Sequence, residues 1–160
     1  MRLKILSIGK MKKGPERELL ERYCDRATKA GRQLGIQEVA VGEWVESRNM
    51  NAEQRKGEEA GQLLAGLRPG SLLIALDETG SDVTSEAIAA LVETSLADGI
   101  PEICIAIGGP DGHGSEVLER ADKTWRFGRM TWPHQLVRVM AAEQLYRAIT
   151  ILSGHPYHRE

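Results

Sequence analysis

The stretch SLLIALDETGSDVTSEAIAALVETSLADGIPEICIAIGG (Ser71–Gly109) decides the fold. It opens with the apolar run SLLIALD (Ser71–Asp77) and ends with a second one, ICIAIGG (Ile103–Gly109). Between them, TSEAIAALVETSLADG has the spacing of a helix, with Thr84 or Ser85 as its N-cap. Continuous apolar runs on either side of a helix are typical of parallel strands buried on both faces. The stretch therefore predicts one strand, helix and strand unit of a parallel sheet.

The same alternation continues on both sides of this stretch. Further strands are expected at Leu3–Ile8, Ile36–Val41 and Lys123–Phe127, and helices from near Pro15, over Ala52–Leu67, after the turn PDGHG, and from Pro133 to about Leu152. The segments GEWVESRNMN (42–51) and ETGSD (78–82) are expected to be a loop and an acidic turn. We therefore predict a single α/β domain over residues 1–160, with a parallel sheet covered by helices on both faces.

Composition and charge indicate a globular protein with an uneven charge distribution. Hydrophobic residues make up 41% and charged residues 28% of the 160 residues, which excludes a wholly disordered chain. The net charge of −2 argues weakly against generic nucleic-acid binding. From Arg126 onward, however, five arginines face only Glu143 and Glu160. Aromatic residues also gather there, which suits RNA phosphates and base stacking, but an ordinary charged helix with core aromatics explains it equally well.

Several kinds of site are not expected. Cys24 and Cys104 have no CxxC spacing and are expected to be buried free thiols. His155 and His158 have HxxH spacing, but Pro156 forbids a regular helix between them and no further ligand is near, so we expect no metal. No run approaches the roughly twenty apolar residues of a membrane span, and no signal peptide is evident, so we expect no membrane association and a cytoplasmic location. No GxSxG or paired Cys and His supports a covalent hydrolase.

Three turns are candidates for a ligand site, because parallel sheets bind ligands at the carboxyl ends of their strands. They are residues Asp77–Asp82, Gly108–Gly114 and Gly128–Pro133. The glycine turn IAIGGPDGHG fits neither GxGxxG nor GxxxxGK, so a plain tight turn is the alternative. We expect His113, within that turn, to be exposed to solvent.

The last helix has one apolar and one polar side. His134 and Arg138 are four residues apart and share a face, as do Glu143 and Arg147, which are expected to form a surface ion pair. The core stripe is expected to consist of Leu136, Val139, Met140 and Ile149. The polar side is then either solvated or lines a site.

Four motifs together carry a family resemblance: LDETG with TSEAIA, then IAIGGPDG, then MTWPHQLVRVMAAEQLYRA, and finally HPYHRE. In order and spacing they resemble the ribosomal RNA large subunit methyltransferase H family of the SPOUT superfamily, over essentially the whole chain. The resemblance implies a parallel α/β fold with a C-terminal trefoil knot, an exception to the rule that chains avoid threading loops. It also implies a homodimer, a site at the subunit interface, and S-adenosylmethionine as cofactor. The implied reaction is methylation of N3 of a pseudouridine in large-subunit (23S) ribosomal RNA.

The resemblance also implies which residues contact the cofactor. These are Leu76, Gly108, Phe127, Gly128, Arg129, Met130, Thr131 and Trp132. The chain departs from the family here, because it has FGRMT where many relatives have a serine-containing LSxMT-like loop. Backbone contacts would survive this change, but a serine hydroxyl contact would be lost, and Arg129 adds a charge beside the cationic sulfonium.

The implied chemistry requires a proton to leave N3 before the ring can attack the methyl group. A general base or an anion-stabilising cation is therefore required. His134 and His158 are candidate bases, since histidine titrates near neutrality. Arg138 and Arg159 would stabilise the anion or hold phosphates, and Tyr157 would stack on the target base. The sequence leaves open which histidine is the base and in which subunit's site the tail acts.

Two other functions remain open on the sequence alone. One is a different SPOUT reaction, on another base or on a ribose 2′-hydroxyl. The other is a ribosome-binding or nucleotide-sensing module without catalysis, which need not bind S-adenosylmethionine. Because the chain is small and acidic and has no added RNA-binding domain, we expect it to recognise ribosomal RNA in the assembled ribosome.

Overall fold

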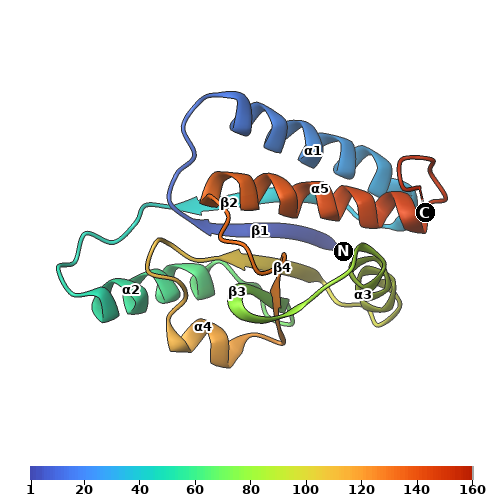
Figure 1. Cartoon of the computed structure of the whole chain (residues 1–160). Helices are drawn as coiled ribbons and strands as arrows, with labels where there is room; N and C mark the ends of the chain where they lie inside the picture. The colour runs from blue at the N-terminus through green and yellow to red at the C-terminus, as the bar shows by residue number, and fades with distance from the viewer. Residues whose placement is uncertain (160) are drawn as a thin grey trace.

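The computed structural model describes residues 1–159 and contains one five-stranded sheet (Figure 1). All strand pairs are parallel, in the order β2-β1-β4-β3-β5. The strands are β1 (Arg2–Ile8), β2 (Glu38–Trp44), β3 (Leu72–Asp82), β4 (Glu102–Ile107) and β5 (Lys123–Arg126). The helices are α1 (Pro15–Gly31), α2 (Ala52–Ala65), α3 (Ser85–Ala97), α4 (Ser115–Arg120) and α5 (His134–Leu152), with a 3-10 turn at Arg32–Leu34. The predicted parallel α/β fold is confirmed.

Helices cover both faces of the sheet, as predicted. In Figure 1, α1 and α5 lie above the sheet and α2 and α4 below it, and α3 packs beside α5. Because successive side chains of a strand point to opposite faces, Ile5 joins the core under α1 and α5 while Leu6 joins the core over α2 and α4. Cys104 is fully buried in the second core, and burial raises the pKa of its thiol. Cys24 is half-buried.

Two predicted loops contain strand instead. β2 continues to Trp44, where the carbonyl accepts a hydrogen bond from the backbone N–H of Gly9 at 2.6 Å. β3 continues through the expected acidic turn, with a bulge between Leu76 and Ser81. Gly80 permits this, because a Cβ there would lie 2.5 Å from the carbonyl carbon of Trp125 in β5. Both predictions were wrong because the pairing partners of these residues are distant in the sequence.

The connection between the last strand and the last helix bears on the implied knot. The loop after β5 leads into α5, which packs between α1 and α3. The trefoil knot itself stays a prediction. Within residues 1–159, no helix combines the length and the apolar character that crossing a membrane requires.

Candidate functional site

A cavity of about 900 Å³ lies at the carboxyl ends of β3 and β4, beside the loop that follows β5. Its walls come from residues 76–79, 107–113 and 126–132, with Lys56 from α2, Leu118 from α4, and His134 and Val137 from α5. The eight positions implied for the cofactor all line it, namely Leu76, Gly108, Phe127, Gly128, Arg129, Met130, Thr131 and Trp132. The structure thus brings residues of all three predicted turns together at the edge where parallel sheets bind ligands.

The glycine turn is narrow because backbone packs on backbone. A Cβ on Gly108 would lie 2.9 Å from the carbonyl carbon of Gly112 and 3.0 Å from its oxygen. Gly112 has a φ of +82° and donates its N–H to the carbonyl of Gly109 at 3.0 Å. Any side chain at position 108 would force the turn open. The turn therefore presents bare main chain to the cavity, which a ligand can approach closely.

Arg55 of α2 clamps this turn from outside. Its Nε and Nη2 donate to the two carboxylate oxygens of Asp111 at 2.7 and 3.0 Å, and this pairing lowers the pKa of Asp111. The Nη1 group donates to the carbonyls of Asn49 and Met50 at 2.8 and 3.1 Å. One guanidinium thus fixes the glycine turn to α2 and to the loop before it. Arg55 could not be predicted from the sequence, because nothing in the pattern of α2 connects it to a turn 56 residues further along the chain.

His113 was expected in solvent, and this prediction is wrong. Only 7% of the residue is exposed, and it lines the cavity. Its Nε2 lies 3.2 Å from the carbonyl oxygen of Ala106, so the ring donates from Nε2 in its neutral form. The buried Nδ1 has no hydrogen-bond partner among the described residues. Burial lowers the pKa of His113, although the nearby carboxylate of Asp77 opposes this. The imidazole is therefore uncharged and supports the glycine turn from beneath, through its hydrogen bond to β4.

Side-chain hydrogen bonds fix the loop after β5 at its entry and at its exit. Trp132 donates its indole N–H to the carbonyl of Phe127 at 3.0 Å, and Gly128 between them has a φ of +96°. At the entry to the loop, Arg126 donates to both carboxylate oxygens of Asp82 at 2.7 and 3.2 Å, and this lowers the pKa of Asp82. The loop is therefore shaped before any ligand arrives.

The two polar residues in the first turns of α5 have different surroundings. His134 is exposed on the rim of the cavity. Arg138 was expected on the same open face, but its side chain is only 4% exposed. It donates from Nη1 to Oε1 of Glu43 at 2.9 Å and from Nη2 to the carbonyl of Ile8 at 2.7 Å. The expectation that this polar side is solvated or lines a site is wrong for Arg138, which ties α5 to the ends of β1 and β2.

The tail after α5 docks onto its own subunit through Tyr157. The hydroxyl of Tyr157 donates to Oε1 of Glu143 at 3.0 Å and lies 3.3 Å from the hydroxyl of Tyr23. Its ring is 4.7 Å from that of Tyr146, and the guanidinium of Arg147 lies 4.9 Å from the ring centroid. Burial, with these hydrogen bonds, raises the pKa of Tyr157. The expected stacking face is therefore occupied within this subunit.

The other tail residues lie far from the cavity. Nε2 of His158 is 3.4 Å from Oε1 of Glu86 in α3, and Arg159 is exposed. Glu160, the last residue of the resembling motif, lies outside the described residues. The 19 residues of α5 separate His134 from this tail, which corresponds to about 28 Å at 1.5 Å per residue. Within one subunit, the structure does not bring His158 and Arg159 to the cavity that His134 borders.

The ion pair predicted on α5 is present but is not a simple surface pair. Nε of Arg147 donates to Oε1 of Glu143 at 2.9 Å, and both side chains remain partly exposed, at 25% and 17%. The same carboxylate oxygen accepts the Tyr157 hydroxyl. The pair therefore anchors the tail.

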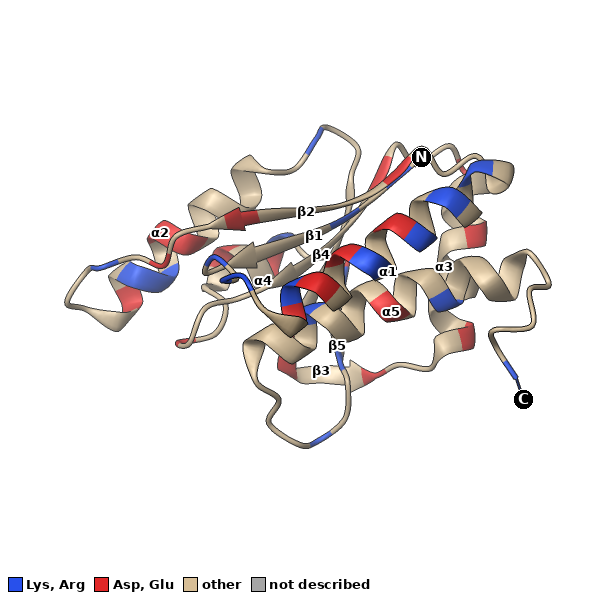
Figure 2. Cartoon of the chain, turned by 90° about the horizontal axis from the view of Figure 1, so that it is seen from above, with Lys and Arg blue, Asp and Glu red and all other residues tan. Residues whose placement is uncertain are grey.

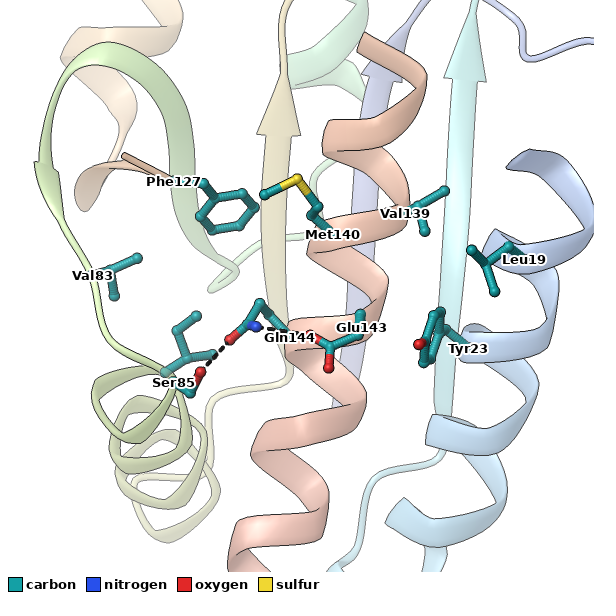
Figure 3. Close-up of a pocket in the computed structure, with 10 residues that line it drawn as sticks. Leu19, Tyr23, Val83, Ser85, Phe127, Val139, Met140, Glu143 and Gln144 are labelled. Carbon is teal, nitrogen blue, oxygen red and sulfur yellow. Dashed lines mark hydrogen bonds between the residues drawn. The ribbon is translucent and has the colours of Figure 1, made fainter. Parts of the chain in front are cut away.

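A second hollow, of about 460 Å³, follows the outer side of α5 between α1 and α3 (Figure 3). Apolar side chains form most of its wall, including Leu19, Val83, Phe127, Val139 and Met140. At its polar end, Ser85 donates to the side-chain oxygen of Gln144 at 2.7 Å. The groove contains none of the implied cofactor positions except Phe127. Among residues 1–159, no group of three His, Cys, Asp or Glu side chains is placed to hold a metal ion.

Comparison with known proteins assigns the family. A family model described as "Predicted SPOUT methyltransferase" matches residues 1–158. The chain is 53% identical over 159 residues to a Ribosomal RNA large subunit methyltransferase H of Rhizobium leguminosarum bv. trifolii, covering 99% of each chain. It is 52% identical to the protein of that name from Methylocella silvestris, over the full length of both. A probable methyltransferase from Bordetella pertussis shares the fold, with a TM-score of 0.51 at 15% identity over 92% of this chain and 93% of that one. As the resemblance predicts, the chain belongs to the SPOUT methyltransferase family.

Proposed function

We propose that this protein transfers a methyl group from S-adenosylmethionine to N3 of a pseudouridine in the ribosomal RNA of the large subunit. The observation that carries the proposal is the cavity, which all eight implied cofactor positions line at the carboxyl edge of a parallel sheet. The relatives that match the whole chain bear the name of a methyltransferase of large-subunit ribosomal RNA. Residues 1–160 are proposed to form one methyltransferase domain.

The residues of the cavity fit this cofactor. Main chain at Gly108 has no room for a side chain, so it can lie directly against a ligand. Leu76, Phe127 and Trp132 offer apolar surface to an adenine ring or a methionine side chain. The bound cofactor would supply an activated methyl group on a sulfonium, and the protein would hold the acceptor in line with it.

His134 is the candidate base that the cavity itself provides. It is exposed on the rim, where a base entering the cavity would meet it. Its imidazole would accept the N3 proton of the uracil-type ring, whose lone pair then attacks the methyl group. Arg138 would act indirectly, because its guanidinium is buried against Glu43 rather than open to the substrate.

A homodimer would unite the two separated halves of the proposed site. Tyr157, His158 and Arg159 lie at the far end of α5 from the cavity of their own subunit, so we propose that they act in the cavity of the partner. The apolar groove along α5 supports an interface there, since Leu19 in its wall remains 37% exposed in the single chain. Leu136, outside the groove on the same helix, is 42% exposed. The ring of Tyr157 would leave its present contacts, or use its free edge, to meet the target base.

A mixed dimer distinguishes action within one subunit from action across the interface. One subunit carries Gly108→Ala and keeps its tail, and the other lacks residues 157–160 and keeps its cavity. If the tail acts across the interface, one complete site forms, and about half the activity of the native dimer is expected. Activity no greater than that of the two separate homodimers would contradict the proposal.

Nucleoside analysis tests the reaction itself. Purified protein, S-adenosylmethionine and ribosomes from a deletion strain should yield N3-methylpseudouridine, detected by mass spectrometry. A methyl group on another base or on a ribose would indicate a different SPOUT reaction. Failure to bind S-adenosylhomocysteine in calorimetry would indicate a module without catalysis.

The physical setting of the reaction is proposed to be the assembled ribosome in the cytoplasm. The chain carries a net charge of −2, so generic attraction to free RNA is weak. A surface complementary in shape to the assembled ribosome would supply the binding affinity that charge alone does not. Equal methylation rates on protein-free RNA and on ribosomes would contradict this part of the proposal.

A further inference from the structure

The loop between β1 and α1 presents three lysines at the carboxyl edge of the sheet. Lys10, Lys12 and Lys13 are exposed, whereas Met11 between them is only 5% exposed. Figure 2 shows basic residues on the loops at the arrowhead end of β1 and β2, the end at which the cavity lies. Met11 therefore faces inward while its three neighbours point into solvent.

Buried contacts hold the backbone of this loop in place. The N–H of Met11 donates to Oε1 of Glu43 at 2.9 Å, and its carbonyl accepts from Nε of Arg17 at 3.0 Å. Gly9, at the start of the loop, has a φ of +89°, and a Cβ there would lie 3.1 Å from Nη2 of Arg138. The lysines thus extend from a fixed main chain, which lowers the entropy lost when they bind a partner.

Glu43 behind the loop cannot neutralise the lysines. It already pairs with Nη1 of Arg138 at 2.9 Å and with Nη2 of Arg17 at 2.8 Å. Two guanidinium groups share this one carboxylate, so Glu43 is engaged in the interior and forms no ion pair with the lysines. This carboxylate therefore does not cancel the charge that the three lysines present at the surface.

The three lysines also have no acidic partner at the surface. Within residues 1–159, no carboxylate oxygen lies within 4.0 Å of any of their amino groups. Two other basic side chains near the cavity are paired, Arg55 with Asp111 and Arg126 with Asp82, whereas Arg129 in the cavity wall has no ion pair among the described residues. The exposed Glu46 lies beside Gly9 at the start of the loop, since a Cβ there would be 3.2 Å from its Oε1, but it forms no ion pair with the three lysines. The loop therefore offers unneutralised cations, which suit a polyanion.

We propose that residues 10–13 form a phosphate-binding surface that holds the backbone of the RNA substrate beside the cofactor cavity. The identity of the RNA rests on the proposed function. Arg138, one turn after His134 in α5, bonds the carbonyl of Ile8 before the loop and Glu43, which accepts from the N–H of Met11 within it. An RNA strand held by the lysines would therefore lie near the rim of the cavity. The phosphate contact that the sequence suggests for Arg138 is thereby made by these lysines, with Arg138 as their internal support.

Triple substitution of the loop tests the proposal. The loop variant is Lys10→Gln/Lys12→Gln/Lys13→Gln, and a rescue variant places arginine at the same three positions. The matched control removes three exposed cations near the amino ends of β2 and β5: Lys29→Gln/Arg32→Gln/Lys123→Gln. The loop variant and the control have the same net charge, so a difference between them reports position rather than overall charge.

Dissociation constants are measured against ribosomes from a deletion strain over a range of NaCl concentrations. The loop variant should bind about 10- to 100-fold more weakly near physiological salt, and its plot of log affinity against log salt should be shallower by about two. The control should stay within about twofold of the native protein, and the arginine variant should restore binding. Equal behaviour of loop variant and control would overturn the proposal.

Two further measurements separate the alternatives. If the loop variant loses affinity for ribosomes but matches the native protein on protein-free large-subunit RNA at low salt, the partner is an acidic ribosomal protein, and the RNA proposal fails. Calorimetry with S-adenosylhomocysteine should give the same affinity for the native protein and the loop variant. If the native protein binds ribosomes through the loop yet neither binds this ligand nor methylates, the proposed function fails while the binding surface stands.

Discussion

The two ends of α5 use charged side chains in different ways. Near its start, Arg138 is buried and bonded to a carboxylate and a backbone carbonyl, so it fixes the ends of two strands beside the cavity. Near its end, Arg147 and Glu143 are partly exposed and hold Tyr157 of the tail. The first arrangement fixes the strands that carry the cavity. The second holds the tail after α5, which carries none of the strands or helices. We therefore expect the loss of Arg138 to lower stability, and the loss of the tail to lower the rate of methyl transfer rather than stability.

Removing residues 157–160 is the strongest test of this difference. We expect the rate of methyl transfer in a single turnover to fall about a thousandfold, because a candidate base and its neighbours are lost. Cofactor affinity should be unchanged, since none of these residues is among the eight implied cofactor positions. Single-turnover methylation of ribosomes and calorimetry with S-adenosylhomocysteine measure the two quantities. A fully active truncated enzyme would refute the assignment of chemistry to the tail.

Arg138→Met should lower the free energy of unfolding by about 3 kcal/mol, because it leaves Glu43 and the carbonyl of Ile8 buried without this partner. The matched variant Arg147→Met should lower it by no more than about 1 kcal/mol, since that pair is partly exposed. Urea denaturation followed by circular dichroism gives both values. Similar losses for the two variants would mean that the two ends of α5 do not differ as described.

Gly108→Ala should weaken cofactor binding by about a hundredfold, which corresponds to about 2.7 kcal/mol. The added Cβ would lie 2.9 Å from the backbone of Gly112 and must open the turn. Gly61→Ala in α2 is the control, because no atom lies within 4 Å of its added Cβ and alanine favours a helix. Calorimetry should show unchanged affinity for the control. Tight binding by Gly108→Ala would show that the turn has more freedom than its geometry indicates.

The smallest expected effect is a dependence of stability on pH through His113. Burial lowers the pKa of this histidine in the folded protein. As the pH falls below about 6.5, the unfolded chain therefore binds a proton that the folded protein does not. Stability should fall with pH there, by at most about 1.4 kcal/mol per pH unit. His113→Gln should remove the contribution of this histidine to the pH dependence of the free energy of unfolding between pH 6.5 and 5. Urea denaturation at several pH values measures this dependence. The same dependence in the native protein and the variant would contradict the prediction.

Much of the fold could be predicted because its signals are local. The apolar runs of β3 and β4 and the N-cap at Thr84 each depend on a few adjacent residues, and the structure contains all three. The three turns around the cavity were predictable for the same reason, since the end of a parallel strand marks the ligand edge. The eight cofactor positions came from the family resemblance, and their role stays a prediction.

Most of the errors share one physical cause, which is contact between residues distant in the sequence. Arg138 has helical spacing from His134, and no feature of the sequence around it indicates that it forms an ion pair with Glu43. The extension of β3 likewise depends on its pairing with β5. The burial of His113 is different, because its partner Ala106 is only seven residues away, and what hides the ring is the way the glycine turn folds back on β4. A residue's spacing predicts its face of a helix, but only packing decides whether that face meets water or protein.

The sequence by itself determined the alternation of strands and helices, the glycine turn and the family, because each is encoded in short patterns or in residue identity along the chain. The tertiary structure alone decided which charges are available. It buried Arg138 beneath the loop, placed the tail at the far end of α5 from the cavity, and left Lys10, Lys12 and Lys13 without acidic partners in the described chain. The reason is that neutralisation and burial depend on distances in space, which the order of residues does not state.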